Sequence, residues 1–218
     1  ATSAPFTILV NPNPSSPSIT ASGPITFCDG QTVLLTSSQG TGNVWSDGST
    51  SQNNPITVSG SYTVEYTDAN GCSSISDATV VTVNPLPNVN GGSDQSICEG
   101  GEVILSGSGA LSFTWDNGVL DGVPFTPTAT ATYTGTGLDA NGCSNSDQVT
   151  VTVNALPTIT MATIDSVCLD ADAFELLIAT PTGGSYAGPG VSNNEFNAAN
   201  AGVGIHSVSY SYTDANGC

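Results

Sequence analysis

The sequence has no lysine and no arginine in 218 residues, although basic side chains make up about an eighth of an average chain. With 18 aspartates and glutamates and one histidine, its formal net charge is −18. We therefore expect it to repel nucleic acids and anionic membranes, which bind proteins through basic groups. The same absence removes the phosphate clamp, the Schiff-base lysine and the cationic oxyanion donor that many enzymes use. We expect no enzyme and no catalytic residue.

Long apolar runs and metal-binding cysteine spacings are also missing. No apolar stretch reaches the ~18–20 residues that span a bilayer, so we expect no direct membrane insertion. The six cysteines form no C-x-x-C pair, and His206 alone cannot complete a set of zinc ligands. His206 is therefore expected to be a structural or surface residue. An even number of cysteines at one pair per repeating unit indicates disulfides and an oxidising compartment.

One short polar string occurs three times and indicates a repeated domain. It reads TDANGC at 67–72, LDANGC at 138–143 and TDANGC again at 213–218. Asn-Gly is the dipeptide that most readily takes two positive φ angles, so the string predicts a two-residue turn between strands, fastened by the cysteine that follows. Two other features recur in register with it: cysteines at 28, 98 and 168, and the linkers VNPNP (10–14), VNPLP (83–87) and VNALP (153–157).

These intervals predict an array of domains of about 70 residues. In the second unit Val153 follows Cys143 by ten residues, and Val10 would follow Cys218 by ten if Ala1 were placed directly after it. We therefore expect the 218 residues to be a slice of a longer repetitive chain, with the missing strand supplied by a neighbouring copy or by further chain. The predicted segments are 1–12, the last strand of a preceding repeat; 13–86, repeat 1; 87–156, repeat 2; and 157–218, repeat 3 without its last strand.

Apolar residues alternate along short segments and predict an all-β fold. In SGSYTVEYTDANGC, Tyr62, Val64 and Tyr66 point inward, whereas Thr63 and Glu65 point outward. Segments of this kind are separated by Gly, Pro, Ser and Asn, and no helical period is present. Short strands at this spacing favour a β-sandwich in each repeat.

The order cysteine, tryptophan, tyrosine-rich strand, cysteine resembles the immunoglobulin-like arrangement, with the second cysteine moved beyond the Asn-Gly turn. The resemblance implies tandem immunoglobulin-like β-sandwich domains with one disulfide per domain: Cys28–Cys72, Cys98–Cys143 and Cys168–Cys218. A domain of about 70 residues is marginal on its core alone, and closing a loop of about 45 residues would stabilise it by about 4 kcal/mol. The expected core aromatic residues are Trp45, Trp115, Tyr186, Tyr62, Tyr66, Tyr133, Tyr210 and Tyr212.

Calcium is the alternative interpretation of the repeated turns. Each turn carries oxygen donors two residues apart, which are the kind of ligand that calcium prefers. One carboxylate per turn is too few for a calcium loop, so no cofactor and no metal are expected. The donor pairs are Asp68 and Asn70, Asp139 and Asn141, and Asp214 and Asn216.

Nearly the whole chain resembles the tandem immunoglobulin-like repeats of giant surface adhesins of gliding bacteria exported by type IX secretion. The motifs that carry the resemblance are the NPxP linkers, C-x-G, WSDG at 45–48, SGSYTV at 59–64 and TDANGC. It implies display on the bacterial outer cell surface, outside the cell, as the stalk or adhesive segment of a gliding-motility adhesin. Its partners would be neighbouring repeats, surface polysaccharide or other cells. Asp165-Ser166-Val167 fits the strings that carry O-glycans in these bacteria, which makes Ser166 a candidate for O-glycosylation.

Two other functions stay open. Carbohydrate-binding or spacer modules of a secreted enzyme would need exposed aromatic platforms, so solvent-exposed, coplanar Trp45 and Trp115 would favour them. A subunit of an extracellular filament would instead join copies end to end through residues 1–10.

Overall fold

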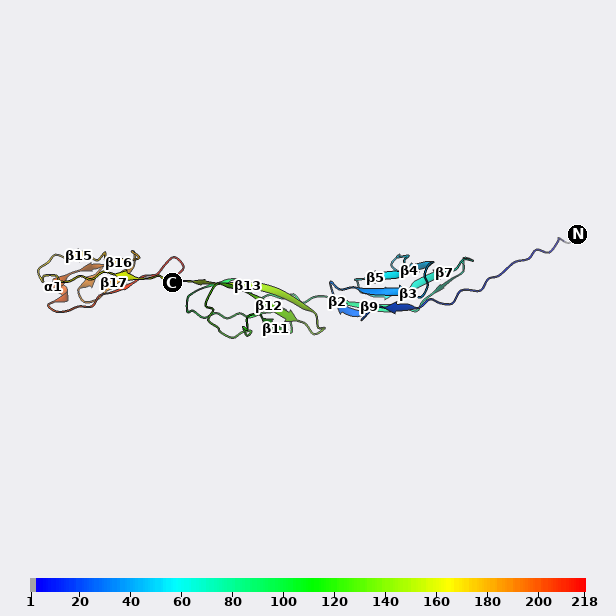
Figure 1. Cartoon of the computed structure of the whole chain (residues 1–218), viewed down its shortest axis with the longest axis horizontal. Helices are drawn as coiled ribbons and strands as arrows, with labels where there is room; N and C mark the ends of the chain where they lie inside the picture. Colours follow the sequence, from blue (N-terminus) through cyan, green and yellow to red (C-terminus); the bar gives the residue numbers. More distant parts are fainter. Residues whose placement is uncertain (1–2) are drawn as a thin grey trace. The chain divides into compact units, whose positions relative to one another are not determined.

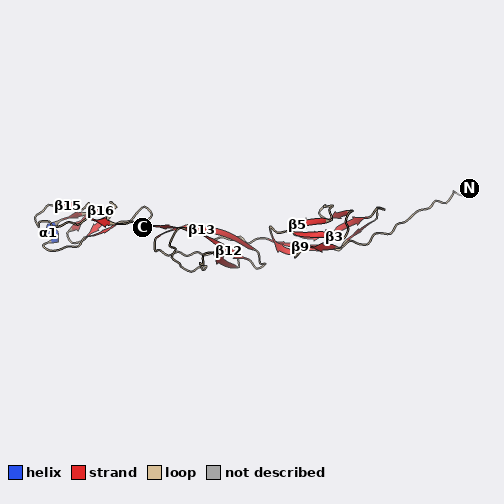
Figure 2. Ribbon diagram, in the orientation of Figure 1, coloured by secondary structure: helices blue, strands red, loops and turns tan. Residues whose placement is uncertain are grey.

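The computed structural model describes residues 3–218 and is built from short strands with one helix of four residues (Figures 1 and 2). The expected all-β, immunoglobulin-like fold is confirmed. The chain forms two compact units: one is Ala1–Asn90, Ser108–Phe113 and Thr136–Ser146, and the other is Gly91–Gly107, Thr114–Gly135 and Asp147–Cys218. The boundaries of the three repeats remain predictions, and we refer to them as repeats 1, 2 and 3.

Repeat 1 is a sandwich of two layers. One layer is the sheet β1-β3-β5, and the other contains the sheets β2-β9-β6 and β4-β7-β8. The tyrosine-rich segment contributes a strand to each sheet of the second layer, because β6 pairs with β9 and β7 pairs with β4. The strands are β1 (Ile19–Ala21), β2 (Thr26–Cys28), β3 (Val33–Ser37), β4 (Asn43–Trp45), β5 (Asn53–Ile56), β6 (Gly60–Tyr62), β7 (Val64–Thr67), β8 (Ser73–Ile75) and β9 (Thr79–Asn84).

The core of repeat 1 lies between these layers and follows the alternation of the sequence. Val33 and Leu35 of β3 and Ile56 of β5 point inward from one side. Trp45 and Val64 point inward from the other, and Val81 of β9 joins them. In β3, β4 and β5 every second side chain is buried, which is the pattern expected of sheets with one face on the core.

Strand direction fixes the two ends of repeat 1. β2 runs parallel to β9, with Cys28 opposite Asn84, the last residue of β9. β6 runs antiparallel to β9, with Tyr62 opposite Thr79, the first residue of β9. The chain continues from Tyr62 through β7 to the turn at 68–72, so this turn lies beyond the beginning of β9 and Cys28 lies at its end.

Repeat 2 forms a four-stranded sheet in the order β10-β13-β12-β11. β10 runs parallel to β13 with Cys98 opposite Asn154, as Cys28 lies opposite Asn84 in repeat 1. Single β-bridges, Asn90 with Ser108 and Val103 with Phe125, stand where repeat 1 has its other sheet. The strands are β10 (Gln95–Cys98), β11 (Ser112–Trp115), β12 (Ala131–Leu138) and β13 (Ser144–Asn154).

Repeat 3 has three small sheets: β14-β16, β15-β19-β18 and β17-β20. Its helix α1 (Ala198–Ala201), which the sequence did not predict, is a single turn in which the Asn197 side chain accepts the backbone N–H of Asn200 at 3.0 Å. The strands are β14 (Thr160–Met161), β15 (Phe174–Glu175), β16 (Ala179–Thr180), β17 (Ser185–Ala187), β18 (Val191–Ser192), β19 (Glu195–Phe196) and β20 (Ser209–Ser211).

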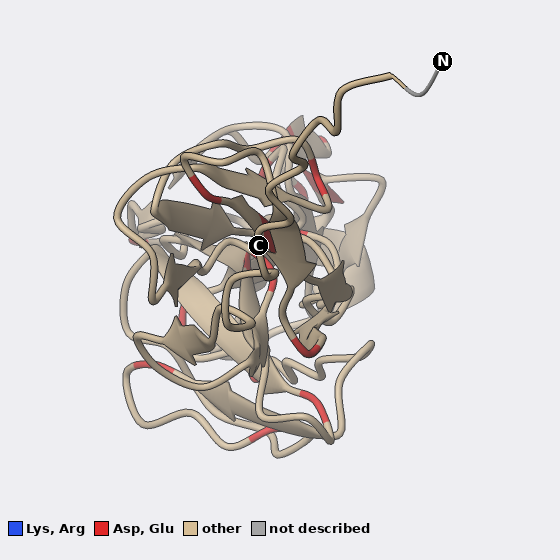
Figure 3. Cartoon of the chain, turned by 90° about the vertical axis from the view of Figure 1, so that its right-hand side faces the viewer, with Lys and Arg blue, Asp and Glu red and all other residues tan. Residues whose placement is uncertain are grey.

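Acidic side chains are distributed over strands and loops, and no basic side chain balances them (Figure 3). No helix among residues 3–218 has the length and apolar character needed to cross a membrane. The apolar side chains Phe6, Ile8, Leu9 and Val10 are largely exposed, and no strand is assigned to residues 3–18.

Candidate functional site: the cysteine-bearing turns

The repeated string DANGC forms a closed turn around its aspartate. Asp68 Oδ1 accepts hydrogen bonds from the backbone N–H groups of Asn70 and Cys72, both at 2.9 Å. The backbone N–H of Asp68 donates to the carbonyl of Cys72 at 2.9 Å, and that of Gly71 donates to the carbonyl of Asp68 at 3.1 Å. The carboxylate therefore holds the cysteine in place.

The other two turns repeat this geometry. Asp139 Oδ1 accepts from Asn141 and Cys143 at 2.8 Å each, and Asp214 Oδ1 accepts from the corresponding backbone groups at 2.9 Å each. The expected two-residue turn with two positive φ angles is wrong. Only the glycine of each Asn-Gly pair has a positive φ, at 78°, 80° and 83°. The loop is a type I turn closed by a left-handed glycine, which is the three-residue hairpin connection.

The structure contains two disulfides, Cys28–Cys143 and Cys98–Cys218. The predicted bridges Cys28–Cys72, Cys98–Cys143 and Cys168–Cys218 are therefore wrong. Each bond joins the strand cysteine of one repeat to the turn cysteine of the next. Within residues 3–218, the two cysteines outside these bonds are Cys72, half-buried, and Cys168, exposed.

Strand direction explains the correction. The prediction placed the strand cysteine and the turn of one repeat at the same end of the sandwich. Because β2 is parallel to β9, Cys28 lies where β9 leaves repeat 1, at the end away from the turn at 68–72. The linker that follows β9 leads to the turn of repeat 2, where Asn145 Nδ2 donates to the carbonyl of Pro87 at 3.1 Å. Cys28 therefore meets Cys143.

The carboxylate of each cysteine turn is engaged with its own loop. Each turn carboxylate accepts two backbone N–H groups through the same oxygen, Oδ1, and is held against its own loop. Within the described part of the chain, no three His, Cys, Asp or Glu side chains gather as a metal site would require.

Both tryptophans lie inside the sandwich, where they cannot serve as platforms for sugar rings. Trp45 is 2% exposed and its Nε1 donates to the carbonyl of Ser51 at 2.8 Å. Trp115 is 7% exposed and its Nε1 donates to Asp121 Oδ1 at 2.9 Å. The same oxygen accepts the backbone N–H of Gly107 at 2.7 Å. The sequence analysis did not single out Asp121, because repeat 1 has no carboxylate in this role.

The predicted core tyrosines are buried to different degrees. Tyr133 is buried and its ring meets Phe125 edge to face, with centroids 5.2 Å apart. Tyr186 and Tyr210 pack together with centroids 4.6 Å apart. Tyr62, Tyr66 and Tyr212 are half-buried. Burial and the nearby Asp47 carboxylate raise the pKa of Tyr62, which hydrogen-bonds through its hydroxyl to the carbonyl of Val58.

One carboxylate outside the turns has a shifted pKa. Asp147 Oδ2 accepts the backbone N–H of Gly91 at 2.9 Å, and Oδ1 accepts that of Gln148 at 2.9 Å. These two hydrogen bonds favour the ionised form and hold the pKa of Asp147 below its usual value. Asp147 therefore ties the start of repeat 2 to its last strand.

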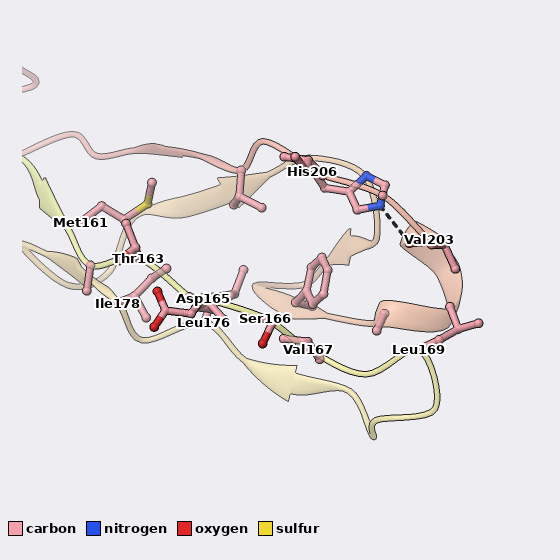
Figure 4. Close-up of a pocket in the computed structure, with 18 residues that line it drawn as sticks. Met161, Thr163, Asp165, Ser166, Val167, Leu169, Leu176, Ile178, Val203 and His206 are labelled. Atoms are coloured by element: carbon pink, nitrogen blue, oxygen red, sulfur yellow. Dashed lines mark hydrogen bonds between the residues drawn. The ribbon is translucent and has the colours of Figure 1, made fainter.

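A cavity of about 560 Å³ opens in repeat 3 (Figure 4). One wall carries Asp165, Ser166 and Val167, and His206 stands on the opposite wall. His206 Nε2 lies 2.9 Å from the carbonyl of Gly202, so its ring is engaged with its own loop. The remaining lining is mostly apolar and includes Met161, Leu176, Ile178, Phe196, Val203 and Val208.

Several solved structures resemble parts of this chain. No family model matches the chain, and no curated protein matches it. Among solved structures, the insect immune protein hemolin matches with a TM-score of 0.38 and 15% identity over 66% of this chain and 49% of hemolin. Sidekick-1 immunoglobulin domains 1–4 match with a TM-score of 0.27 and 16% identity over 62% of this chain and 50% of that one.

Fibronectin(III)-like modules of Clostridium thermocellum CbhA match with a TM-score of 0.30 and 13% identity over 63% of this chain and 94% of theirs. The chain spans about half the length of hemolin and of the Sidekick-1 fragment. Disulfides are typical of secreted and extracellular proteins.

Proposed function

We propose that this chain is a load-bearing stalk segment of a large repetitive bacterial cell-surface adhesin. The observation that carries the proposal is the pair of disulfides, which tie successive repeats together instead of closing each repeat on itself. A bond of this kind adds nothing to a single free domain, but it passes tension from one repeat to the next. The absence of basic residues suits such a segment, because trypsin-like proteases have no cleavage site in it.

The gliding-motility adhesin and its export by type IX secretion follow from the sequence resemblance and belong to this proposal. Repeats of the same chain would be the immediate partners. Surface polysaccharide or other cells would be the partners of the adhesin as a whole. Catalysis is not part of the proposed role. Ser166 is exposed, as a serine that carries an O-glycan must be.

Carbohydrate-binding modules of a secreted enzyme are less well supported. That function needs aromatic rings on the surface, whereas both tryptophans are buried and hydrogen-bonded through Nε1. The subunit of an extracellular filament is the alternative that an observation favours, since the apolar side chains of residues 6–10 are exposed.

Surface labelling tests the proposal. Antibodies raised against the 218-residue chain should label intact source cells, and beads coated with them should travel along gliding cells. Labelling only after permeabilisation would contradict surface display, and labelled cells whose beads stay still would contradict the gliding role. An antibody to a cytoplasmic protein is the control for cell integrity.

A further inference from the structure

The N-terminal apolar segment, defined here as residues 5–11, has the pattern of a core strand but no partner strand in the described chain. Its alternate side chains Phe6, Ile8 and Val10 are 82%, 73% and 83% exposed. Alternating apolar residues of this kind normally cover a core, and an exposed row of them is a template for pairing with another sheet.

The last strands of repeats 1 and 2 show what this segment would do if it were paired. Aligning the Val-Asn-Pro and Val-Asn-Ala linkers places Phe6 with Val149, Ile8 with Val151 and Val81, and Val10 with Val153 and Val83. Val149 and Val151 are 0% exposed and Val81 is 1% exposed. Phe6 and Ile8 therefore correspond to buried residues of repeat 2, and Val10 corresponds to the half-buried Val83 and Val153.

Repeat 3 has the place for such a strand. In repeat 1 the last strand, β9, lies between β2 and β6. The counterparts of β2 and β6 in repeat 3 are residues 166–168 and 206–208, and no strand is assigned to either in the structure. Both line the 560 Å³ cavity, from opposite walls (Figure 4).

The two unbonded cysteines fit the same arrangement. Cys28 lies opposite Asn84 and is bonded to the turn cysteine of the next repeat. In the alignment, Asn11 corresponds to Asn84 and Cys168 to Cys28. The Cys72 thiol already contacts the carbonyl of Asn11, with 3.9 Å between Sγ and the oxygen. A strand that pairs Asn11 with Cys168 would therefore bring Cys168 to Cys72.

We propose that the N-terminal apolar segment of one copy forms the last strand of repeat 3 in a second copy, and that Cys72 of the first copy forms a disulfide with Cys168 of the second. The segment would run parallel to residues 166–168 and antiparallel to residues 206–208, and its apolar side chains would fill the cavity. The inference belongs to the filament alternative of the proposed function, in which separate copies meet, and it does not depend on surface display.

The covalent step needs an oxidant. The Cys72 and Cys168 thiols lose two protons and two electrons as their sulfur–sulfur bond forms. A small-molecule disulfide such as oxidised glutathione accepts them and is reduced to two thiols. Strand pairing comes first, because it sets the two sulfurs side by side.

Mixing two single-cysteine variants tests the pairing. The C72S chain keeps Cys168, and the C168S chain keeps Cys72. When they are mixed at equal concentration with oxidised glutathione, one of them labelled with ¹⁵N, the mixed dimer should exceed each homodimer at least tenfold by intact mass. A 1:2:1 mixture of dimers, or no dimer, would overturn the proposal.

Charged substitutions test the strand and its direction. F6D/I8D in the C168S chain, which donates the segment, should slow formation of the mixed dimer at least tenfold. The same pair of substitutions in the C72S chain should leave the rate unchanged, because that copy contributes repeat 3. L111D is the matched control, since Leu111 is 75% exposed and lies outside the segment. Equal slowing by F6D/I8D in either chain would overturn the proposal.

A peptide test does not depend on the disulfide. A synthetic peptide of residues 3–14 added to the C72S/C168S chain carrying F6D/I8D should slow amide exchange at 166–168 and 206–208 at least tenfold. A scrambled peptide of the same composition should have no effect. Protection elsewhere only, or none with the chain folded by circular dichroism, would overturn the proposal.

Discussion

At the scale of single residues, the aspartate of each DANGC turn fixes its cysteine. One carboxylate oxygen accepts two backbone N–H groups, including that of the cysteine itself. The sequence string predicted a turn here, because Asp, Asn and Gly each favour one. It could not distinguish the two-residue turn from the three-residue turn, since both place Gly after Asn; they differ in the φ of Asn and in which flanking residues pair.

Replacing Asp139 by alanine should destabilise the turn that carries Cys143. Two backbone N–H groups lose their acceptor, at a cost of about 1–3 kcal/mol in the free energy of unfolding. Urea denaturation followed by tryptophan fluorescence measures the loss. D139N keeps the accepting oxygen and should cost less; a D139N variant as unstable as D139A would contradict this role of Oδ1.

Asp147 should make the chain less stable in acid. Because its folded pKa lies below the usual value of about 3.9, its contribution is complete above that pH and is lost as the pH falls through the folded pKa. D147N should therefore lower stability more at pH 6 than at pH 2, as measured by urea denaturation at each pH. D172N, at an exposed aspartate, is the matched control for charge. An equal loss at both pH values would show that the effect is not linked to ionisation.

At the scale of elements, strands were predictable and their order was not. The alternation around Val33, Leu35 and Val64 is local, so it can be read from the sequence. The cysteine pairing depends instead on β2 running parallel to β9, which is a contact between residues more than fifty positions apart. Cys28 therefore lies at the far end from its predicted partner, Cys72. The cavity in repeat 3 was also not predictable, since it depends on how several short strands pack.

Removing one disulfide should distinguish cysteine pairing between repeats from the predicted pairing within repeats. C28S/C143S deletes a cross-link that closes a loop of 115 residues and should lower the free energy of unfolding by about 4–5 kcal/mol in the chain-entropy description. C72S should leave the stability of the separated chain unchanged, because Cys72 is not bonded in the structure. Urea denaturation of both variants is the measurement. A large loss of stability with C72S alone would support the predicted pairing within repeats.

At the scale of the whole molecule, the two disulfide loops overlap. One loop runs from Cys28 to Cys143 and the other from Cys98 to Cys218, so residues 98–143 belong to both. A force applied to the two ends of the chain reaches Cys218 through residues 1–28, the first bond, residues 98–143 and the second bond. The rest of the chain is shielded from extension.

Pulling single molecules by their ends should show that the two disulfides limit the extension of the chain. Fully extended at ~3.5 Å per residue, the reduced chain would reach about 750 Å, whereas the oxidised chain would stop at about 250 Å. Force spectroscopy with and without a reductant measures both lengths. An oxidised chain that extends as far as the reduced one would contradict the overlap.

The overlap of the two loops also gives every peptide bond from Cys28 to Cys218 a second covalent route around it. Hydrolysis at any one position in that stretch leaves a nicked molecule whose fragments are still joined by at least one sulfur–sulfur link. A protease must cut twice, or act together with a reducing agent, before any fragment of this part of the chain is released.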